Sequence, residues 1–238
     1  MSGTVYWVPQ LICITTMNDT RLEYNKRLKE IEIYFETLKF LDDGDCSIKC
    51  KDILGVETEK TIDFELSTIL KANGYLLLYN LVESTVSKSI DAVLQSIHAS
   101  SATYRSLSCA FRKLWIKQET KNIAKDKIIL IANSVLENEL LTLKKECINI
   151  SGNIDAQKIR EVLKQIGGNE IKDGRDLENI KNKRNCLAHG DFSFSEIGKD
   201  CTVAELISYK ENVKDYLSKV LDEIEAYIAS KKFLHVNT

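Results

Sequence analysis

The chain has 238 residues, 44% of them hydrophobic and 29% charged, so it is long and apolar enough to fold around its own core. Its single proline, Pro9, and its ten glycines favour helices and argue against a turn-rich β-sandwich. The formal net charge of -2 excludes a chain that is basic as a whole, so any RNA site must be a local basic patch.

The first predicted helix spans residues 21–41, and Gly44 ends it. Its apolar face recurs every three or four residues, at Leu28, Ile31, Phe35 and Leu38. Residues 42–62 are polar and mixed, which predicts a long loop that includes a short extended piece near Ile48.

The strongest helix pattern covers residues 63–99. Its middle, YLLLYNLV (Tyr75 to Val82), is apolar nearly all round, which is typical of a helix buried inside a bundle. Residues 101–147 predict one or two further helices and include an apolar stretch from Ile128 to Leu143.

Three more helices are predicted towards the end of the chain. The first spans 155–166 before Gly167, and the second spans 176–189 before Gly190, since glycine accepts the left-handed conformation that ends helices. The last starts at a T-x-x-E capping box, Thr202 with Glu205, and reaches about residue 232. We therefore expect one all-α domain of six or seven helices at residues 21–235, with loose ends at 1–16 and 233–238 and with 1–20 as an N-terminal extension.

The cysteines and the hydropathy of the chain indicate which classes of protein it does not resemble. The seven cysteines are odd in number and scattered, which is atypical of a secreted disulfide framework. Cys46 and Cys50 form a C-x3-C pair without a second pair at zinc-finger spacing, so we expect neither a metal site nor a cofactor. No apolar run reaches the roughly 18 residues of a membrane span, and residues 1–16 lack a basic start. We expect a cytoplasmic protein with no membrane contact.

One of the three histidines, His189, has an arginine a short distance upstream, in RNCLAHG (Arg184 to Gly190). The spacing alone leaves two interpretations open. A histidine that ends a helix complements the negative end of the helix dipole, and the arginine is then an ordinary surface residue. Alternatively, the two residues form a catalytic pair.

The wider context resembles the HEPN superfamily, in the branch of predicted ribonucleases from prokaryotic defence and toxin–antitoxin operons. The resemblance rests on RN-x-LAHG at a helix end, followed by GDFSF and a long C-terminal helix. It extends to ILKANGYLLLYNLVESTV, SGNIDAQKIREVL and SEIGKDCTVAEL. It implies a homodimer in which Arg184 and His189 of both subunits share one cleft, with Asn185 as the usual polar residue after the arginine.

RNA cleavage without a metal needs these residue types. The 2′-OH attacks the adjacent phosphorus, one group accepts its proton, and another protonates the leaving 5′-oxygen. Histidine can fill either role, and a guanidinium can hold the charge of the phosphorane. Arg184 and His189 point about 140° apart on a regular helix, so a dimer cleft or an unwound helix end must let them converge.

Further residues near the motif have two interpretations each. The cations Lys172, Arg175, Lys181 and Lys183 form either an RNA-binding patch or an ordinary solvated helix face. Glu83 is predicted to orient Arg184 or His189 from a neighbouring helix, and Asn80 to line the cleft. The alternative is that both belong to structural hydrogen bonds or a solvated stripe.

The sequence thus predicts a metal-independent endoribonuclease, acting as a toxin or antiviral defence effector, with RNA and a cognate antitoxin or defence protein as partners. The alternative is a catalytically inert HEPN module that binds RNA or mediates dimerisation. Some HEPN toxins carry a tyrosine two residues after the histidine, which a partner modifies with AMP. Asp191 stands there, which puts silencing by that route in doubt.

Overall fold

The computed structural model describes residues 16–44, 46–121, 125–150 and 152–235. This part of the chain is a mostly helical single domain with 68% helix, which confirms the predicted all-α class. It contains eight helices of α type, one more than the upper expectation, because the six-residue α7 had not been predicted.

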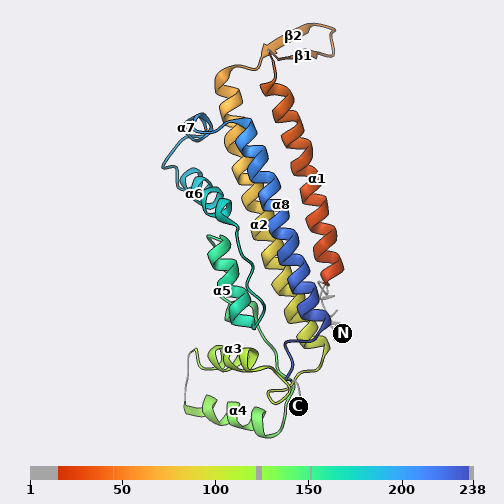
Figure 1. Ribbon diagram of the computed structural model, residues 1–238, viewed down its shortest axis with the longest axis vertical. Helices are drawn as coiled ribbons and strands as arrows, with labels where there is room; N and C mark the ends of the chain where they lie inside the picture. Colours follow the sequence, from red (N-terminus) through yellow and green to blue (C-terminus); the bar gives the residue numbers. More distant parts are fainter. Residues whose placement is uncertain (1–15, 45, 122–124, 151, 236–238) are drawn as a thin grey trace, which may run out of the picture.

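Three long helices form the body of the molecule: α1 (Met17–Asp42), α2 (Phe64–Ala99) and α8 (Val203–Ala229) (Figure 1). Helices α2 and α8 run in the same direction, and α1 runs antiparallel to both. Helix α2 lies at the centre and contacts α1, α6, α7 and α8, as its all-round apolar middle predicts. Sixteen of its residues are buried.

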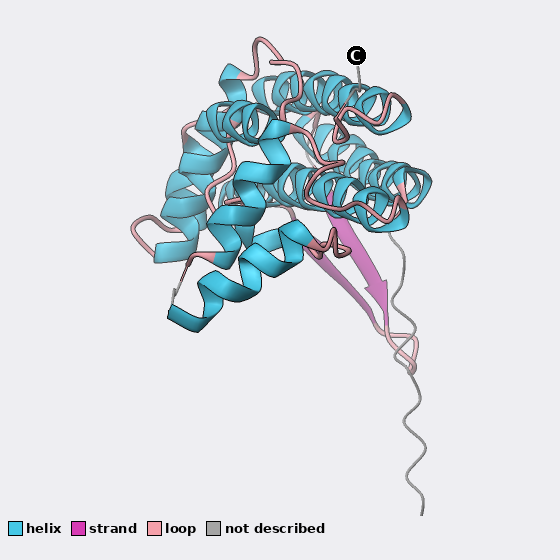
Figure 2. Cartoon of the chain, turned by 90° about the horizontal axis from the view of Figure 1, so that it is seen from below, coloured by secondary structure: helices cyan, strands magenta, loops and turns pink. Residues whose placement is uncertain are grey.

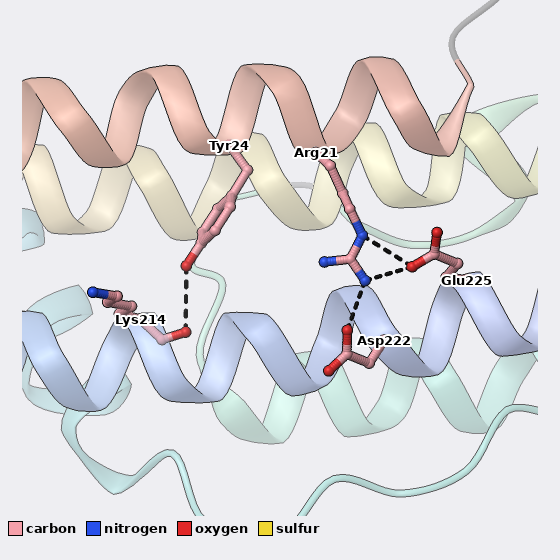
Figure 3. Close-up of polar contacts among 5 residues, drawn as sticks. All are labelled: Arg21, Tyr24, Lys214, Asp222 and Glu225. Atoms are coloured by element: carbon pink, nitrogen blue, oxygen red, sulfur yellow. Dashed lines mark hydrogen bonds and ion pairs between the residues drawn. The ribbon is translucent and has the colours of Figure 1, made fainter.

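Polar contacts tie α1 to α8 at the edge of this bundle (Figure 3). The Arg21 guanidinium donates to Glu225 at 2.9 Å and to Asp222 at 2.6 Å, and the Tyr24 hydroxyl donates to the Lys214 carbonyl at 3.3 Å. Helix α1 begins four residues before the predicted start, because Thr16 and Asp19 form a capping box. Residues 17–20 therefore belong to the bundle, while residues 1–15 lie outside the described part.

The remaining helices pack beside the bundle and below it: α3 (Cys109–Glu119), α4 (Lys125–Leu136), the short 3₁₀ helix η1 (Lys145–Cys147), α5 (Ala156–Ile166), α6 (Arg175–His189) and α7 (Phe194–Lys199). Helices α5 and α6 lie along the side of the α2–α8 pair (Figure 1). Helix α7 contacts α2 so closely that a Cβ on Gly198 would lie 1.8 Å from the Thr68 carbonyl oxygen. Only glycine fits at that crossing.

The structure corrects or completes three expectations about segments outside the long helices. The extended piece expected near Ile48 is confirmed as β1 (Ser47–Lys51), but the rest of residues 42–62 is not all loop, because β2 (Glu57–Thr61) pairs with β1 in an antiparallel hairpin that projects away from the bundle (Figure 2). Its strands are fully exposed, so no apolar face marked them in the sequence. The apolar stretch 128–143 is helical only to Leu136. The last described residues are not loose, since Phe233 is 2% exposed and the His235 N–H donates to the Ser106 carbonyl.

Candidate active site

Helix α6 carries the arginine–histidine motif, and glycines determine where it begins and ends. Gly174 precedes it with φ 85°, and a Cβ there would lie 2.7 Å from the Tyr216 ring. At the other end Gly190 has φ 74° and closes the helix, as predicted. The helix is therefore regular up to His189, and an unwound end does not bring Arg184 and His189 together.

Buried apolar contacts and side-chain bonds to neighbouring segments hold α6. Leu177 and Ile180 are buried against the core. Lys181 Nζ lies 2.6 Å from Asp155 Oδ2 at the start of α5, and Lys183 Nζ lies 3.2 Å from Asp200 Oδ2 after α7. These bonds fix the direction in which the last turns of α6 present their side chains.

The Lys181–Asp155 ion pair is well shielded from solvent, with 17% and 16% of the two side chains exposed. Burial by itself raises the pKa of Asp155, but the hydrogen bonds from Lys181 and from the Lys158 N–H outweigh it. The net effect is a lowered pKa, so Asp155 stays ionised and keeps its ion pair and its role as N-cap of α5.

The Arg184 side chain contacts residues of α2 and of its own helix. Its guanidinium carbon lies 4.1 Å from the centre of the Tyr79 ring, and its Nη1 donates to Asn185 Oδ1 at 2.9 Å. Its Nη2 lies 3.9 Å from Glu83 Oε2, a distance for an ion pair rather than a hydrogen bond. The side chain is 26% exposed, so the guanidinium is oriented and remains open to solvent.

Sequence reasoning missed two contributors to this geometry, Tyr79 and Asn153. Tyr79 is 1% exposed, and its hydroxyl accepts a hydrogen bond from the Ile154 N–H at 3.2 Å. Asn153 Oδ1 accepts from Asn185 Nδ2 at 2.8 Å. The four-residue spacing of Tyr79 and Glu83, which places both on one face of α2, was the available signal for the first. No local pattern marked Asn153.

The other predicted site residues do not join the contacts around Arg184. His189 is exposed at the helix end, and its side chain makes no hydrogen bond, ion pair or ring contact with another described residue. Asn80 is also exposed and without such a contact, so it is not the buried polar group that its apolar surroundings suggested. Of the four cations, Lys172 and Arg175 are exposed near the start of α6, whereas Lys181 and Lys183 are bound to aspartates. The structure therefore does not join the four into one open patch.

The comparison with known families decides the class of this domain. A family model described as MAE_28990-like HEPN matches residues 21–233. The chain belongs to this HEPN family. The match spans the helices from α1 to α8 and includes the whole of α6, so the motif residues lie within this HEPN domain. No curated protein matches the chain, and no solved structure does.

Two further properties of this HEPN domain bear on the sequence predictions. No helix among the described residues has the length and apolar content to cross a membrane. Within the same residues, no group of three or more His, Cys, Asp or Glu side chains is placed to hold a metal ion, and this includes Cys46 and Cys50 near β1.

Proposed function

We propose that this HEPN domain is a metal-independent endoribonuclease that cleaves RNA as a homodimer, as a toxin or antiviral defence effector. HEPN domains are often ribonucleases. The observation that carries the proposal is the end of α6, where an oriented guanidinium at Arg184 lies about one and a half turns before an exposed imidazole at His189, which is not hydrogen-bonded or ion-paired to a described residue.

In the proposed reaction the 2′-oxygen of the substrate forms a bond to phosphorus, and the bond from phosphorus to the 5′-oxygen breaks. His189 of one subunit accepts the 2′-OH proton, and His189 of the second subunit donates a proton to the leaving oxygen. The Arg184 guanidinium donates hydrogen bonds to the phosphorane oxygens. The products are a 2′,3′-cyclic phosphate and a free 5′-OH.

The regular end of α6 supports the homodimer. Within one chain, side chains five residues apart on a helix point about 140° apart, so one copy does not easily aim both groups at one phosphate. A two-fold axis beside the helix end allows Arg184 of one copy and His189 of the other to converge. Asn185 then positions Arg184, and Glu83 balances its charge. Asn80 is open to the cleft, and Lys172 and Arg175 are free to contact RNA phosphates.

The alternative is a catalytically inert HEPN module that binds RNA or dimerises within a defence or toxin–antitoxin complex. One observation favours it: Arg184 already has an aromatic face, an amide oxygen and a carboxylate as partners. A purely structural arginine would have the same set of contacts.

Cleavage of labelled RNA in EDTA by wild type and by His189→Ala tests the proposal. Loss of general acid–base catalysis lowers the rate by about 10²–10⁴-fold. His235→Ala is the matched control, because His235 is also exposed but its N–H is bonded to Ser106, in the segment between α2 and α3 rather than on α6. DNA of the same sequence lacks the 2′-OH and stays intact. If wild type binds RNA without cutting it, the inert module is the correct function.

A further inference from the structure

A cavity of about 480 Å³ lies between α2 and residues 145–150, 152 and 154, and no residue of the arginine–histidine motif lines it. We call it the α2 cavity. Its volume falls within the usual range of ligand sites. It is lined by Glu83 and Ser87 from α2, by Lys145 and Glu146 from η1, by Lys121, and by residues of the following segment.

Two contacts place the α2 cavity beside the motif. Glu83 lines the cavity and also lies 3.9 Å from the Arg184 guanidinium. Asn153 binds the Asn185 side chain, and its neighbours Gly152 and Ile154 line the cavity. A phosphate bound at Arg184 would therefore lie next to the α2 cavity.

The lining suits a flat, mostly neutral group with polar edges. Among the apolar lining residues, Ile148 and Ile154 are buried, and the partly exposed Ile150 offers an apolar surface for the face of a ring. Lys145 is already bound to Asp91 and Ser87, both at 2.6 Å, so its charge is balanced. A nucleobase has this combination of apolar faces and hydrogen-bonding edges.

The carboxylates in the cavity accept hydrogen bonds but cannot donate them when ionised. Glu146 is exposed, and its side chain makes no ion pair or hydrogen bond with a described residue. Guanine carries two adjacent donors, N1–H and N2–H, that match one carboxylate. At the rim, Lys121 is exposed without a described side-chain partner, which suits a flanking phosphate.

We propose that the α2 cavity is the subsite for the base next to the cleaved bond and that Glu146 makes it select guanine. This deepens the proposed ribonuclease function and rests on it for the position of the cut. Base binding itself is independent of cleavage, and so the two can be tested apart.

The binding experiment uses the full chain with His189→Ala, which leaves the RNA uncut. Fluorescence anisotropy follows short single-stranded RNAs that differ in one base. We expect the guanine-containing RNA to bind most tightly, and Glu146→Gln to reduce that preference about tenfold or more, the discrimination of one good carboxylate–base pair. Glu137→Gln, which removes the same charge from an exposed position outside the cavity, leaves the preference intact.

Two further variants separate base recognition from phosphate contact. Ser87→Phe fills the cavity and should abolish the base preference, whereas Ser96→Phe, a similarly exposed serine on the same helix, should not. Lys121→Ala should weaken the binding of all RNAs alike and should reduce the slope of the logarithm of the binding constant against the logarithm of the salt concentration by about one. Lys113→Ala should change neither quantity. Thermal unfolding verifies that each variant is folded.

Sequencing the fragment ends produced by wild type completes the test. Cuts beside guanine that become unselective in Glu146→Gln support the subsite. If wild type cuts RNA without regard to the neighbouring base, the subsite is wrong and the nuclease function stands. If guanine binding depends on Glu146 but no RNA is cut, the nuclease function is wrong, and the α2 cavity remains a guanine-binding site with no role in cleavage. A base preference unchanged by both Glu146→Gln and Ser87→Phe overturns the subsite.

Discussion

The first turns of α6 are held by buried contacts, whereas its last turns carry side chains that are half-buried or exposed. Leu177 and Ile180 are at most 2% exposed, and Lys181 is tied to Asp155. Arg184 is 26% exposed at its side chain, and His189 is open to solvent. The first part of the helix thus contributes to stability, and the second part carries the side chains that the proposed cleavage uses. Substitutions in the two parts should therefore affect different measurements.

The largest effect is expected at Arg184. Arg184→Lys keeps the charge but loses the planar guanidinium and its stacking on Tyr79. The rate of cleavage should therefore fall about 10³-fold, with little change in the free energy of unfolding. Arg112→Lys is the matched control, since Arg112 also lies over a tyrosine ring, that of Tyr104, at 5.7 Å. Initial cleavage rates and thermal unfolding of both variants provide the measurement. Wild-type rates in Arg184→Lys would remove Arg184 from the reaction.

At Leu177 we expect the opposite result, a loss of stability without a loss of cleavage. Leu177→Ala leaves a cavity in the core and should lower the free energy of unfolding by about 3 kcal/mol. The cleavage rate per folded molecule should not change, because the side chain does not reach the motif. Leu136→Ala, 69% exposed on α4, should change the free energy by less than about 0.5 kcal/mol. Urea unfolding measures both, and a loss of cleavage in folded Leu177→Ala would show that the two parts of α6 are coupled.

The ion pair at Asp155 should make the anchoring of α6 dependent on pH. Its pKa is lowered in the folded protein, so its stabilisation is complete above the unfolded value of about 3.9 and is lost as the pH falls through the folded pKa. Asp155→Asn retains an N-cap acceptor and should be about 2 kcal/mol less stable at pH 7.

Urea unfolding of wild type and Asp155→Asn from pH 7 down to pH 3 provides the measurement. The difference between them should shrink as the pH falls below 4. A difference that stays constant over this range would assign the effect to the shape of the side chain rather than to its charge.

The smallest effect is expected at Asn153. Asn153 has φ 56°, which glycine adopts readily, so Asn153→Gly removes only the bond to the Asn185 amide. The free energy of unfolding should change by less than about 1 kcal/mol, and the rate of cleavage should fall less than tenfold. Gly152, with φ 51° and no neighbour within 4 Å of an added Cβ, shows that this turn is not tightly packed. A loss as large as that of Arg184→Lys would mean that Asn153 holds the motif in place.

Much of the helical framework was predictable because its signals are local. The capping box of Thr202 with Glu205, the glycine after His189 and the apolar repeat of α2 each act within a few residues of the chain. The pairing of Arg184 with His189 in one short helix segment is equally local. These features predicted the helices and the motif without any knowledge of the packing.

Contacts between distant segments depended on the packing of the helices. Tyr79 lies beneath Arg184 because α2 and α6 pack together, and Gly198 meets the backbone of α2 because α7 folds back onto it. Lys181 and Lys183 resemble free surface cations in the sequence, yet the folded chain brings an aspartate to each. A local pattern records the preference of a segment for helix and for burial, but the partner of each polar group depends on which distant segment packs against it.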